Sequence, residues 1–484
     1  MISSMRHTFM PFALTLLLAG CALTPAAPPA PVAAPAQYKE SGPWQHAAIS
    51  TAAVPDDWWT LFKDPVLDDL ERQLLVGNEN LKSLVAAVGS ARAVLEASRS
   101  ATSPKLSTGL SATRSGSTPA STSVAVQNPA NDLSLSANAS WEIDLWGRLS
   151  QAATGAQASL QASANDLAAA RLSVQAMLAQ TYFSMRTAEA QQRLLERSVL
   201  AYQRSLDLTQ ARYDGGVAAR TDVLQAQTLL KSAQAQVAES TAQRAQFEHA
   251  IAVLLGLAPS AITIANTGTM VATLATPPSL PATLLERRPD IAAAQSRVAA
   301  AYAQIGVTDA AFFPTLNLTA GAQLGQSALA NLLNAPNSVW ALGAALAEPI
   351  FDGGQRRLAS AQARASAEQA TAAYRLTVLT ALQEVEDNLV LARQLQLEAE
   401  AQQEALQLAQ RTLEITQAQY HGGTVSYLNV VLAQTVAYNS ENSLLNVRNR
   451  QLAAVNLLLK NIAGRWQSSG DDAPVCQAGS NCSL

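Results

Sequence analysis

The sequence predicts a mainly α-helical protein with a small β portion, built as a tandem repeat of a helix, a β-hairpin and a long helical hairpin. First, the turn Tyr213-Asp-Gly-Gly-Val217 recurs as Tyr420-His-Gly-Gly-Thr424, with matching residues on both sides. Second, long stretches without Pro or Gly flank both turns. Third, each half contains two segments in which apolar and polar residues alternate. Self-similarity at such a spacing indicates a duplicated architecture.

Composition excludes several classes of protein. The 484 residues carry a formal net charge of −4 with no basic block, which argues against a nucleic-acid partner. Charged residues make up 14% and hydrophobic residues 49%. Such a composition suits helices that are packed on more than one side. After the N-terminal region no run of about 18 apolar residues occurs, so no membrane-spanning helix is expected in the mature chain.

The N-terminal residues 1–20 have the features of a secretory signal peptide. The run Leu18-Ala-Gly-Cys21 closely resembles a bacterial lipobox, which implies that Cys21 is lipidated and becomes the first residue of the mature chain. The alternative is an ordinary signal peptide with an incidental cysteine. Ala22 follows in place of Asp, which favours the outer membrane in the bacterial sorting rule. No cofactor is expected beyond this covalent lipid.

Both ends of the mature chain lack the pattern of a packed element. Residues 21–54 are rich in Ala and Pro and are expected to form an extended tether. The tail, residues 467–484, contains Cys476 and Cys482. In an oxidising compartment this pair could form a small-loop disulfide, or remain as two thiols.

The first repeat is expected to span residues 55–258. Asp64-Pro65 predicts the start of a helix that runs to about Ser100. A β-hairpin follows at about 104–145, because residues 131–145 alternate without a break and a weaker alternating segment precedes them. Strands of about ten residues match the length needed to cross a membrane, although a half-buried hairpin in a soluble sheet would alternate too.

The second repeat, residues 282–466, has the same order, with its β-hairpin at about 314–350. Residues 259–281 are rich in Pro and are expected to link the repeats. Four strands cannot close a barrel, and an open edge would leave backbone groups unpaired in lipid. The chain is therefore expected to form an oligomer whose barrel has a multiple of four strands.

Two helical hairpins are predicted at 147–256 and 354–462. The first helix, residues 147–212, would be about 100 Å long at roughly 1.5 Å per residue. Its apolar residues recur at spacings of three and four, which is typical of a coiled coil. Such helices must pack sideways, so hairpins from several chains would form a bundle or a hollow cylinder.

No pattern in the sequence indicates catalysis. The four histidines have no metal-ligand spacing, so no metal site is expected. The sequence has no Gly-rich phosphate loop with a lysine and no nucleophile elbow. The chain is therefore predicted not to be an enzyme.

Five motifs together resemble those of the TolC-type outer-membrane efflux proteins, especially their lipoprotein (OprM/NodT-like) branch. The resemblance extends from about Pro55 to Trp466. The motifs are Trp58-Trp59 with Phe62, Leu284-Leu-Glu-Arg-Arg-Pro-Asp-Ile291, Phe312-Phe-Pro-Thr-Leu316, Pro349-Ile-Phe-Asp-Gly-Gly-Gln-Arg356, and the two Tyr-x-Gly-Gly turns.

The resemblance implies a homotrimer in which twelve strands, four from each chain, close one β-barrel in the outer membrane. It implies that the helices form a coiled-coil barrel that extends into the periplasm and ends at the Gly-Gly turns. There the trimer would meet a periplasmic adaptor protein and an inner-membrane pump, of the resistance-nodulation-division type.

The resemblance also assigns roles near the turns. An Asp and a Tyr that narrow the periplasmic tip in the family match Asp222 and Tyr420, whereas the family's Arg after the second turn is replaced by Val425. Acidic positions of the family are occupied by Asn429 and Leu432. The closed tip is therefore expected to depend less on ion pairs and more on Tyr427, Leu428 and Leu432.

The residues expected to contact the adaptor are Gly215, Gly216, Val217, Ala218, Gly422, Gly423 and Thr424. Ordinary heptad or capping roles are the alternative, and Asp222 could be a charge favoured near a helix N-terminus.

The function expected from this resemblance is a passive trimeric duct that carries drugs and other toxic small molecules out of the cell in a tripartite efflux system. One alternative is the exit duct of a type I protein secretion system. Another is a lipid-anchored periplasmic coiled-coil scaffold without a pore. An outer-membrane enzyme is disfavoured, because no catalytic group of residues is present.

Overall fold

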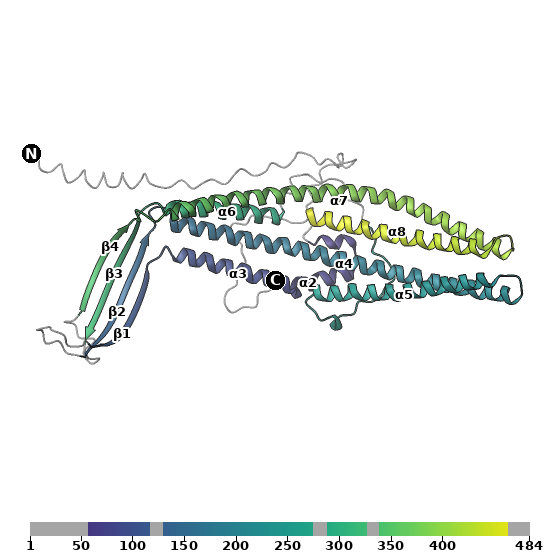
Figure 1. Ribbon diagram of the computed structural model, residues 1–484, viewed down its shortest axis with the longest axis horizontal. Helices are drawn as coiled ribbons and strands as arrows, with labels where there is room; N and C mark the ends of the chain where they lie inside the picture. The colour runs from purple at the N-terminus through teal and green to yellow at the C-terminus, as the bar shows by residue number, and fades with distance from the viewer. Residues whose placement is uncertain (1–56, 117–128, 274–287, 327–337, 463–484) are drawn as a thin grey trace, which may run out of the picture. The chain divides into compact units, whose positions relative to one another are not determined.

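The computed structural model describes residues 57–116, 129–273, 288–326 and 338–462 (Figure 1). Cys21, Cys476 and Cys482 lie outside the described residues, so their predicted lipidation and disulfide stay predictions. Within the described ranges, none of the helices combines the length and apolar character needed to cross a membrane.

The chain forms two compact units, and these do not coincide with the two sequence repeats. The first unit takes Ala87–Ala164 from the first repeat and Ala293–Arg375 from the second. The second unit contains the described parts of Val32–Ala86, Asn165–Ala292 and Leu376–Leu484. Each unit therefore draws on both repeats, because equivalent elements of the two repeats pack side by side.

The first unit contains a single four-stranded antiparallel sheet in the order β1-β2-β3-β4 (Figure 1). Its strands are β1 (Lys105–Ser115), β2 (Ala130–Ile143), β3 (Thr315–Gln326) and β4 (Ser338–Ala347). The hairpin of each repeat is present as predicted, and the pairing of β2 with β3 joins them. The strands β1 and β4 remain at the two edges of the sheet.

The pairing register collects the apolar residues of all four strands on one face. Trp141 lies opposite Leu318, and Leu318 lies opposite Ala344. Similarly, Leu106 lies opposite Ala139, which in turn lies opposite Ala320. Because side chains alternate between the two faces of a strand, Ser, Thr and Asn gather on the other face, where Ser111 and Ser134 share a hydrogen bond of 2.7 Å between their hydroxyl oxygens.

The strand β2 is shorter than the predicted alternation. It ends at Ile143, because Asp144 caps the next helix. The two carboxylate oxygens of Asp144 accept hydrogen bonds from the backbone N–H groups of Leu149 and Ser150, at 3.0 and 2.8 Å. Asp144, which is a polar residue of the alternating pattern, therefore caps the following helix and is not part of the strand.

The predicted helical hairpins are present with ends that differ from the predicted ends by two residues or fewer. The first consists of α4 (Arg148–Asp214) and α5 (Arg220–Leu254), and the second of α7 (Gln355–His421) and α8 (Tyr427–Ile462). The shorter helix α6 (Pro289–Ala310) precedes the second β-hairpin. The predicted fold class, mainly α with a small β portion, is confirmed.

The single helix predicted from Asp64 to Ser100 is wrong, because the chain forms α2 (Pro65–Gly77) and α3 (Glu79–Ser100). Between them Asn78 is extended, and its side chain donates to the carbonyl oxygen of Leu254 at 2.7 Å and accepts from the N–H of Leu81 at 3.0 Å. A Cβ atom on Gly77 would lie 2.1 Å from the carbonyl oxygen of Leu255. The end of α5 therefore lies directly against Gly77 and is bound by the side chain of Asn78, so the predicted helix is interrupted between α2 and α3.

The core of the second unit lies where the 3-10 helix η2 (Trp58–Phe62), α2, α4, α5 and the end of α8 meet. Phe62 packs against Phe183 with ring centroids 4.7 Å apart. The residues that make up much of this core are Trp58, Leu67, Leu74, Leu178, Tyr182, Phe183, Ile251, Leu255, Leu452 and Leu459.

The segment predicted only as a linker is partly built into this core. After the short 3-10 helix η3 (Pro259–Ala261), residues 262–273, which we call the strap, run across α4 and α5. Arg186 donates to the carbonyl oxygen of Ala265 at 2.8 Å, and Arg244 donates to that of Ile264. The buried carboxylate of Glu189 pairs with both arginines, at 2.8 and 3.2 Å. The strap is therefore held by charged side chains of the first repeat.

Candidate functional site: the hairpin turns and the apolar sheet face

The two turns between the long helices have the same backbone structure. Gly216 and Gly423 adopt left-handed conformations with φ of 77° and 76°. In the first turn the N–H of Val217 donates to the carbonyl oxygen of Arg212 at 2.9 Å, and in the second the N–H of Thr424 donates to that of Gln419 at 3.0 Å. This is the Schellman motif, which requires positive φ at one position only. The second glycine of each pair therefore makes the turn possible.

A contact between the two hairpins lies directly before these turns. The Nη1 atom of Arg212, in the last turn of α4, donates to the carbonyl oxygen of Tyr420 near the end of α7 at 2.7 Å. The guanidinium carbon lies 4.7 Å from the centroid of the Tyr420 ring. We call this contact the Arg212–Tyr420 clasp. It joins the last helical turns of both hairpins through a charged hydrogen bond and a cation–π contact.

Behind the clasp lies a small apolar core formed by both hairpins. The rings of Tyr420 and Tyr427 are 5.5 Å apart, and Tyr427 is only 1% exposed. The Tyr427 hydroxyl shares a hydrogen bond of 3.1 Å with Ser205 of α4. Burial raises the pKa of Tyr427, and the nearby Asp222 carboxylate adds to that rise. The Tyr420 hydroxyl is buried and has no hydrogen-bond partner within the described ranges.

Among the predicted tip residues, the structure thus brings Tyr420 and Tyr427 together between the hairpins. Asp222 is half-buried in the first turn of α5. Leu428, Asn429 and Leu432 lie on the exposed side of α8, and Leu432 is 56% exposed. Asn429 and Leu432 line a groove of about 380 Å³ between α7 and α8.

The residues expected to contact an adaptor are largely accessible in this chain. Val217 is 70% exposed, Ala218 is half-buried, and the four turn glycines and Thr424 are exposed. The Thr424 hydroxyl donates to the carbonyl oxygen of Gln419 at 3.0 Å, which stabilises the second turn. The turns therefore present a small, mostly uncharged surface to any partner.

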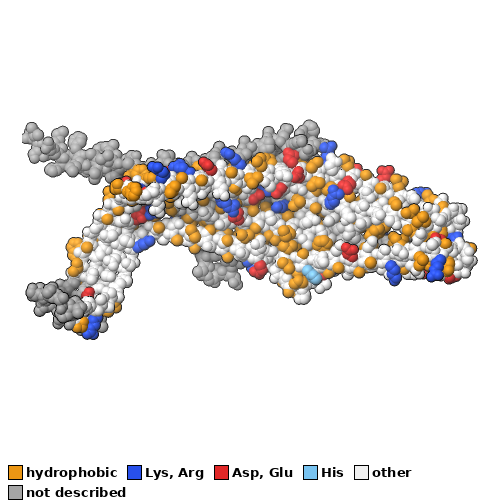
Figure 2. All heavy atoms as spheres, viewed as in Figure 1, with side chains coloured by type: hydrophobic (Ala, Val, Ile, Leu, Met, Phe, Trp, Pro, Cys, Tyr) orange, Lys and Arg blue, Asp and Glu red, His pale blue; other side chains and the backbone are white. Residues whose placement is uncertain are grey.

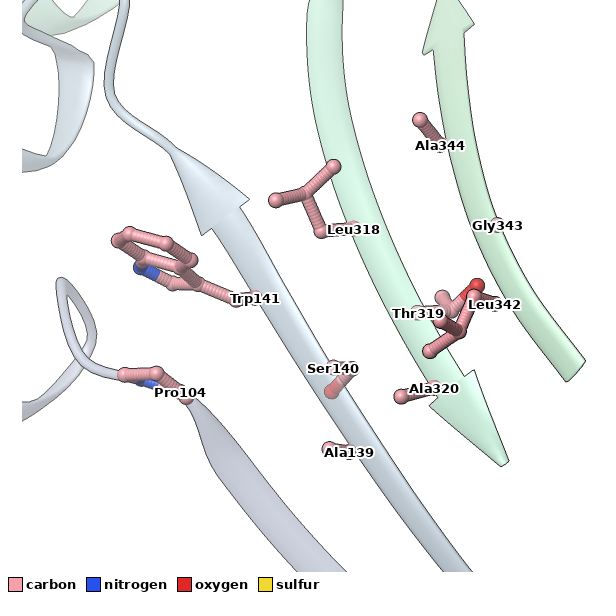
Figure 3. A pocket seen from close by; sticks show the side chains of 10 residues that line it. All are labelled: Pro104, Ala139, Ser140, Trp141, Leu318, Thr319, Ala320, Leu342, Gly343 and Ala344. Carbon is pink, nitrogen blue, oxygen red and sulfur yellow. The ribbon is translucent and has the colours of Figure 1, made fainter. Parts of the chain in front are cut away.

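The apolar face of the sheet is the second feature that could serve function. A shallow groove of about 550 Å³ crosses β2, β3 and β4 on this face, where the small side chains Ala139, Ala320 and Ala344 lie near Trp141 and Leu318 (Figure 3). The Trp141 indole N–H donates to the carbonyl oxygen of Thr102 at 2.8 Å, so its polar atom is satisfied by protein. Figure 2 shows few charged side chains on the visible part of the strands. The apolar face of the sheet therefore favours contact with hydrocarbon.

Sequence reasoning missed Arg212. The residue stands before the first turn, and its partner Tyr420 lies far away in the sequence, so periodicity contains no sign of the contact. One signal was available, because Val425 lacks the charge that the family has after the second turn. That absence could have prompted a search for an arginine on the other hairpin.

Comparison with known proteins identifies the family to which a chain of this architecture belongs. The family model described as outer membrane efflux protein matches residues 70–257 and 280–464. The chain is 30% identical to the probable efflux pump outer membrane protein SepC of Pseudomonas putida, over 96% of this chain and 98% of that protein. It is 31% identical to the pyoverdine export outer membrane protein OpmQ of Pseudomonas aeruginosa, over 94% of this chain and 96% of that protein.

The solved structure of the outer-membrane channel OprN has the same fold. It superposes with a TM-score of 0.84 at 25% identity and covers 91% of this chain and 99% of that channel. The family model matches both repeats, and the relatives match along nearly their whole length. The chain therefore belongs to the outer membrane efflux protein family.

Proposed function

We propose that three copies of this chain form a passive duct through the outer membrane, which carries drugs and other toxic small molecules from a pump and its adaptor to the exterior. Family membership identifies the chain as an outer-membrane channel component of an efflux system. The observation that carries the proposal is the sheet. It is apolar on one face, and in the part of the chain that the structure describes neither β1 nor β4 pairs with a further strand at its outer edge.

The free edges support closure by other copies of the chain. An exposed strand edge presents unpaired N–H and C=O groups, and in hydrocarbon each of these costs several kcal/mol. Pairing β4 of one copy with β1 of the next satisfies these groups around a ring. Three copies then give a barrel of twelve strands, in which Leu342 and its apolar neighbours face lipid and the Ser and Thr face lines the lumen.

The long hairpins support the periplasmic part of the proposal. In the proposed trimer they extend into the periplasm and meet the adaptor at Val217, Ala218 and Thr424, with a resistance-nodulation-division pump beyond it. The lipobox residues Leu18-Ala-Gly-Cys21 support an outer-membrane lipid anchor on Cys21.

The exposed side of α8 supports a gate that is mainly apolar. Leu428 and Leu432 are one helical turn apart and exposed, and Asn429 between them carries no charge. Three copies would bring three such pairs together at the end of the duct. Leu432→Asp should therefore raise the conductance of the closed duct, because three buried charges repel one another and attract water. Asp222→Ala should change it little, and equal leakiness of both variants would contradict an apolar gate.

Channel formation by the full-length protein tests the main proposal. The protein is extracted in mild detergent, its mass is measured by native mass spectrometry, and it is reconstituted into planar bilayers. A mass of three chains and stepwise conductance are the expected results. A monomer without conductance would refute the duct and would support the scaffold hypothesis.

Complementation distinguishes small-molecule efflux from type I protein secretion. The relatives named above are components of an efflux pump and of pyoverdine export, which favours small molecules. The gene is expressed in one strain that lacks its own efflux channel and in another that lacks its secretion duct, each with the cognate pump and adaptor. Restored drug resistance without restored protein secretion is expected, and the reverse result would favour secretion.

A further inference from the structure

We propose that a cavity beneath the strap binds a small molecule with an anionic head group and a compact apolar body. The cavity lies within the second unit, where the start of α2, one turn of α4 and the strap meet. Its volume is about 590 Å³. Ligand sites commonly have volumes of about 300–1,000 Å³, apolar walls and a few convergent polar groups. Neither the duct nor its gate uses this cavity.

The negative charge that lines the cavity is already engaged. One carboxylate oxygen of Asp64 accepts from the N–H groups of Val66 and Leu67 at 3.0 and 3.3 Å, which caps α2. The other oxygen accepts from the Tyr182 hydroxyl at 2.8 Å. Asp64 is therefore held by the helix terminus and by the tyrosine, and its oxygens have little capacity left for a ligand.

A buried arginine retains a free donor at the same cavity. Arg186 is 3% exposed, and its Nε donates to the Tyr182 hydroxyl at 3.0 Å. Its Nη1 donates to Glu189 and to the carbonyl oxygen of Ala265, each at 2.8 Å. Its Nη2 donates to no other residue in the described part of the chain. A guanidinium fixed by three bonds presents its remaining N–H groups in a set direction, which suits a carboxylate or phosphate oxygen.

A second cation at the cavity has a strained backbone. Lys63 has φ of 54° and ψ of 37°, and it is the sole non-glycine residue with positive φ among those that the structure describes. Lys63 is one of the residues that line the cavity, it is exposed, and it has no ion pair within the described ranges. Glycine or asparagine would adopt this conformation at lower cost. This left-handed residue caps the C-terminus of η2, where its N–H donates to the carbonyl oxygen of Thr60 at 3.0 Å, and the cap places the lysine at the cavity.

The remaining walls are mostly apolar, with Thr267 and Thr269 of the strap as their polar residues. Leu61 and Val66 are partly exposed at the cavity, and Met270 and Val271 of the strap pack partly against the core beside it. An apolar body would bury surface against these side chains while the head group meets Arg186 and Lys63. The surplus of cationic donors over free acceptors makes an anionic ligand more suitable than a cationic one.

Titration calorimetry with water-soluble probes tests the proposal on the full-length protein in lipid nanodiscs. Benzoate and phenyl phosphate carry the proposed head groups, and benzyl alcohol is their uncharged analogue. Saturable binding of at least one anion, about tenfold tighter than benzyl alcohol, is the expected result. Comparison of the two anions shows whether carboxylate or phosphate is preferred. Absence of saturable binding of both anions, or equal binding of the alcohol, would overturn the proposal.

Substitution of Lys63 separates ligand binding from folding. Lys63→Gly removes the charge and relieves the backbone strain, so Tm without probe should rise while anion affinity falls about tenfold. Lys63→Gln removes the charge and keeps the strain, so affinity should fall at an unchanged Tm. Lys231→Gln, which removes an exposed lysine of α5, should alter neither. Unchanged affinity in both Lys63 variants would show that Lys63 is not a ligand-binding residue, and a lower Tm for Lys63→Gly would contradict the backbone strain assigned to this position.

Discussion

The Arg212–Tyr420 clasp predicts that Arg212→Gln will make the closed duct leak. The clasp joins the two hairpins immediately before their turns, through a hydrogen bond of 2.7 Å and a ring contact of 4.7 Å. In the proposed trimer we expect the duct to open when the ends of the two hairpins of each chain move apart, which would break the clasp. Glutamine keeps a polar side chain but loses the charge and the planar guanidinium.

The size of the effect follows from the two contacts. A hydrogen bond from a charged group contributes about 1.5–3 kcal/mol, and a cation–π contact at an exposed site contributes about 0.5–1 kcal/mol. Arg212 is half-exposed, so solvent weakens both contacts, and about 2 kcal/mol per chain is a reasonable total. A loss of about 2 kcal/mol changes an equilibrium constant roughly 30-fold. The open fraction should therefore rise by at least that factor when all three chains are altered.

Single-channel recording in planar bilayers measures this change, with uptake of a large antibiotic by cells as a second readout. Arg204→Gln is a matched control, because Arg204 is an exposed arginine of the same helix. Tyr420→Phe is a second control, because it keeps the ring and the backbone carbonyl and removes only a buried hydroxyl that has no hydrogen-bond partner among the described residues. Both controls should behave like the unaltered protein.

Two results would refute this reasoning. The first is an unchanged open probability in Arg212→Gln trimers that assemble normally. The second is leakiness in Tyr420→Phe as large as in Arg212→Gln, because the phenolic hydroxyl would then contribute what we assign to the arginine.

Three further predictions concern the turn, the sheet and a buried acid. Gly216→Ala should lower the stability of the folded state by about 1–2 kcal/mol, because φ of Gly216 is 77°. Gly215→Ala should change the stability little. Thermal unfolding compares the two variants, and an equal loss of stability in both would contradict the assigned turn. Leu342→Arg should reduce the yield of membrane-inserted oligomer, because a cation on the lipid face costs about 2–4 kcal/mol. Ala341→Arg lies on the opposite face of β4 and should be tolerated. Equal losses of inserted oligomer in both variants would argue against the assignment of the faces. Burial raises the pKa of Glu71 to about 9, so the folded state loses stability as pH rises from about 4.5 to about 9, with a cost of up to about 3 kcal/mol at pH 7. Glu71→Gln should therefore match the unaltered protein in Tm near pH 4.5 and exceed it increasingly towards pH 9, and a difference that does not vary with pH would disprove the shift.

The elements with strong local signals could be predicted closely. The long helices follow from the absence of Pro and Gly, and their ends lie next to the Gly-Gly turns. The strands follow from alternation, and the register confirms which residues share the apolar face. Each of these features follows from residues that are close together in the sequence and from the burial of one side of a helix or strand. They can therefore be predicted from the sequence.

Two features depend on contacts between distant segments, and the sequence did not reveal them. The break at Asn78 exists because the end of α5 approaches Gly77. The strap is bound by Arg186 and Arg244, although its sequence looks like an ordinary linker. In each case a residue with no local signal is placed by a partner far along the chain.

By itself, the sequence determined the duplicated architecture, the apolar face of the strands and the family, because each rests on a pattern that recurs along the chain. Only the tertiary structure decided that β2 pairs with β3 across the two repeats, that Arg212 clasps Tyr420, and that Lys63 and Arg186 meet at one cavity. These are juxtapositions of side chains and strands from different segments. Their free energy arises from packing and hydrogen bonds that exist only when the folded chain brings those segments together.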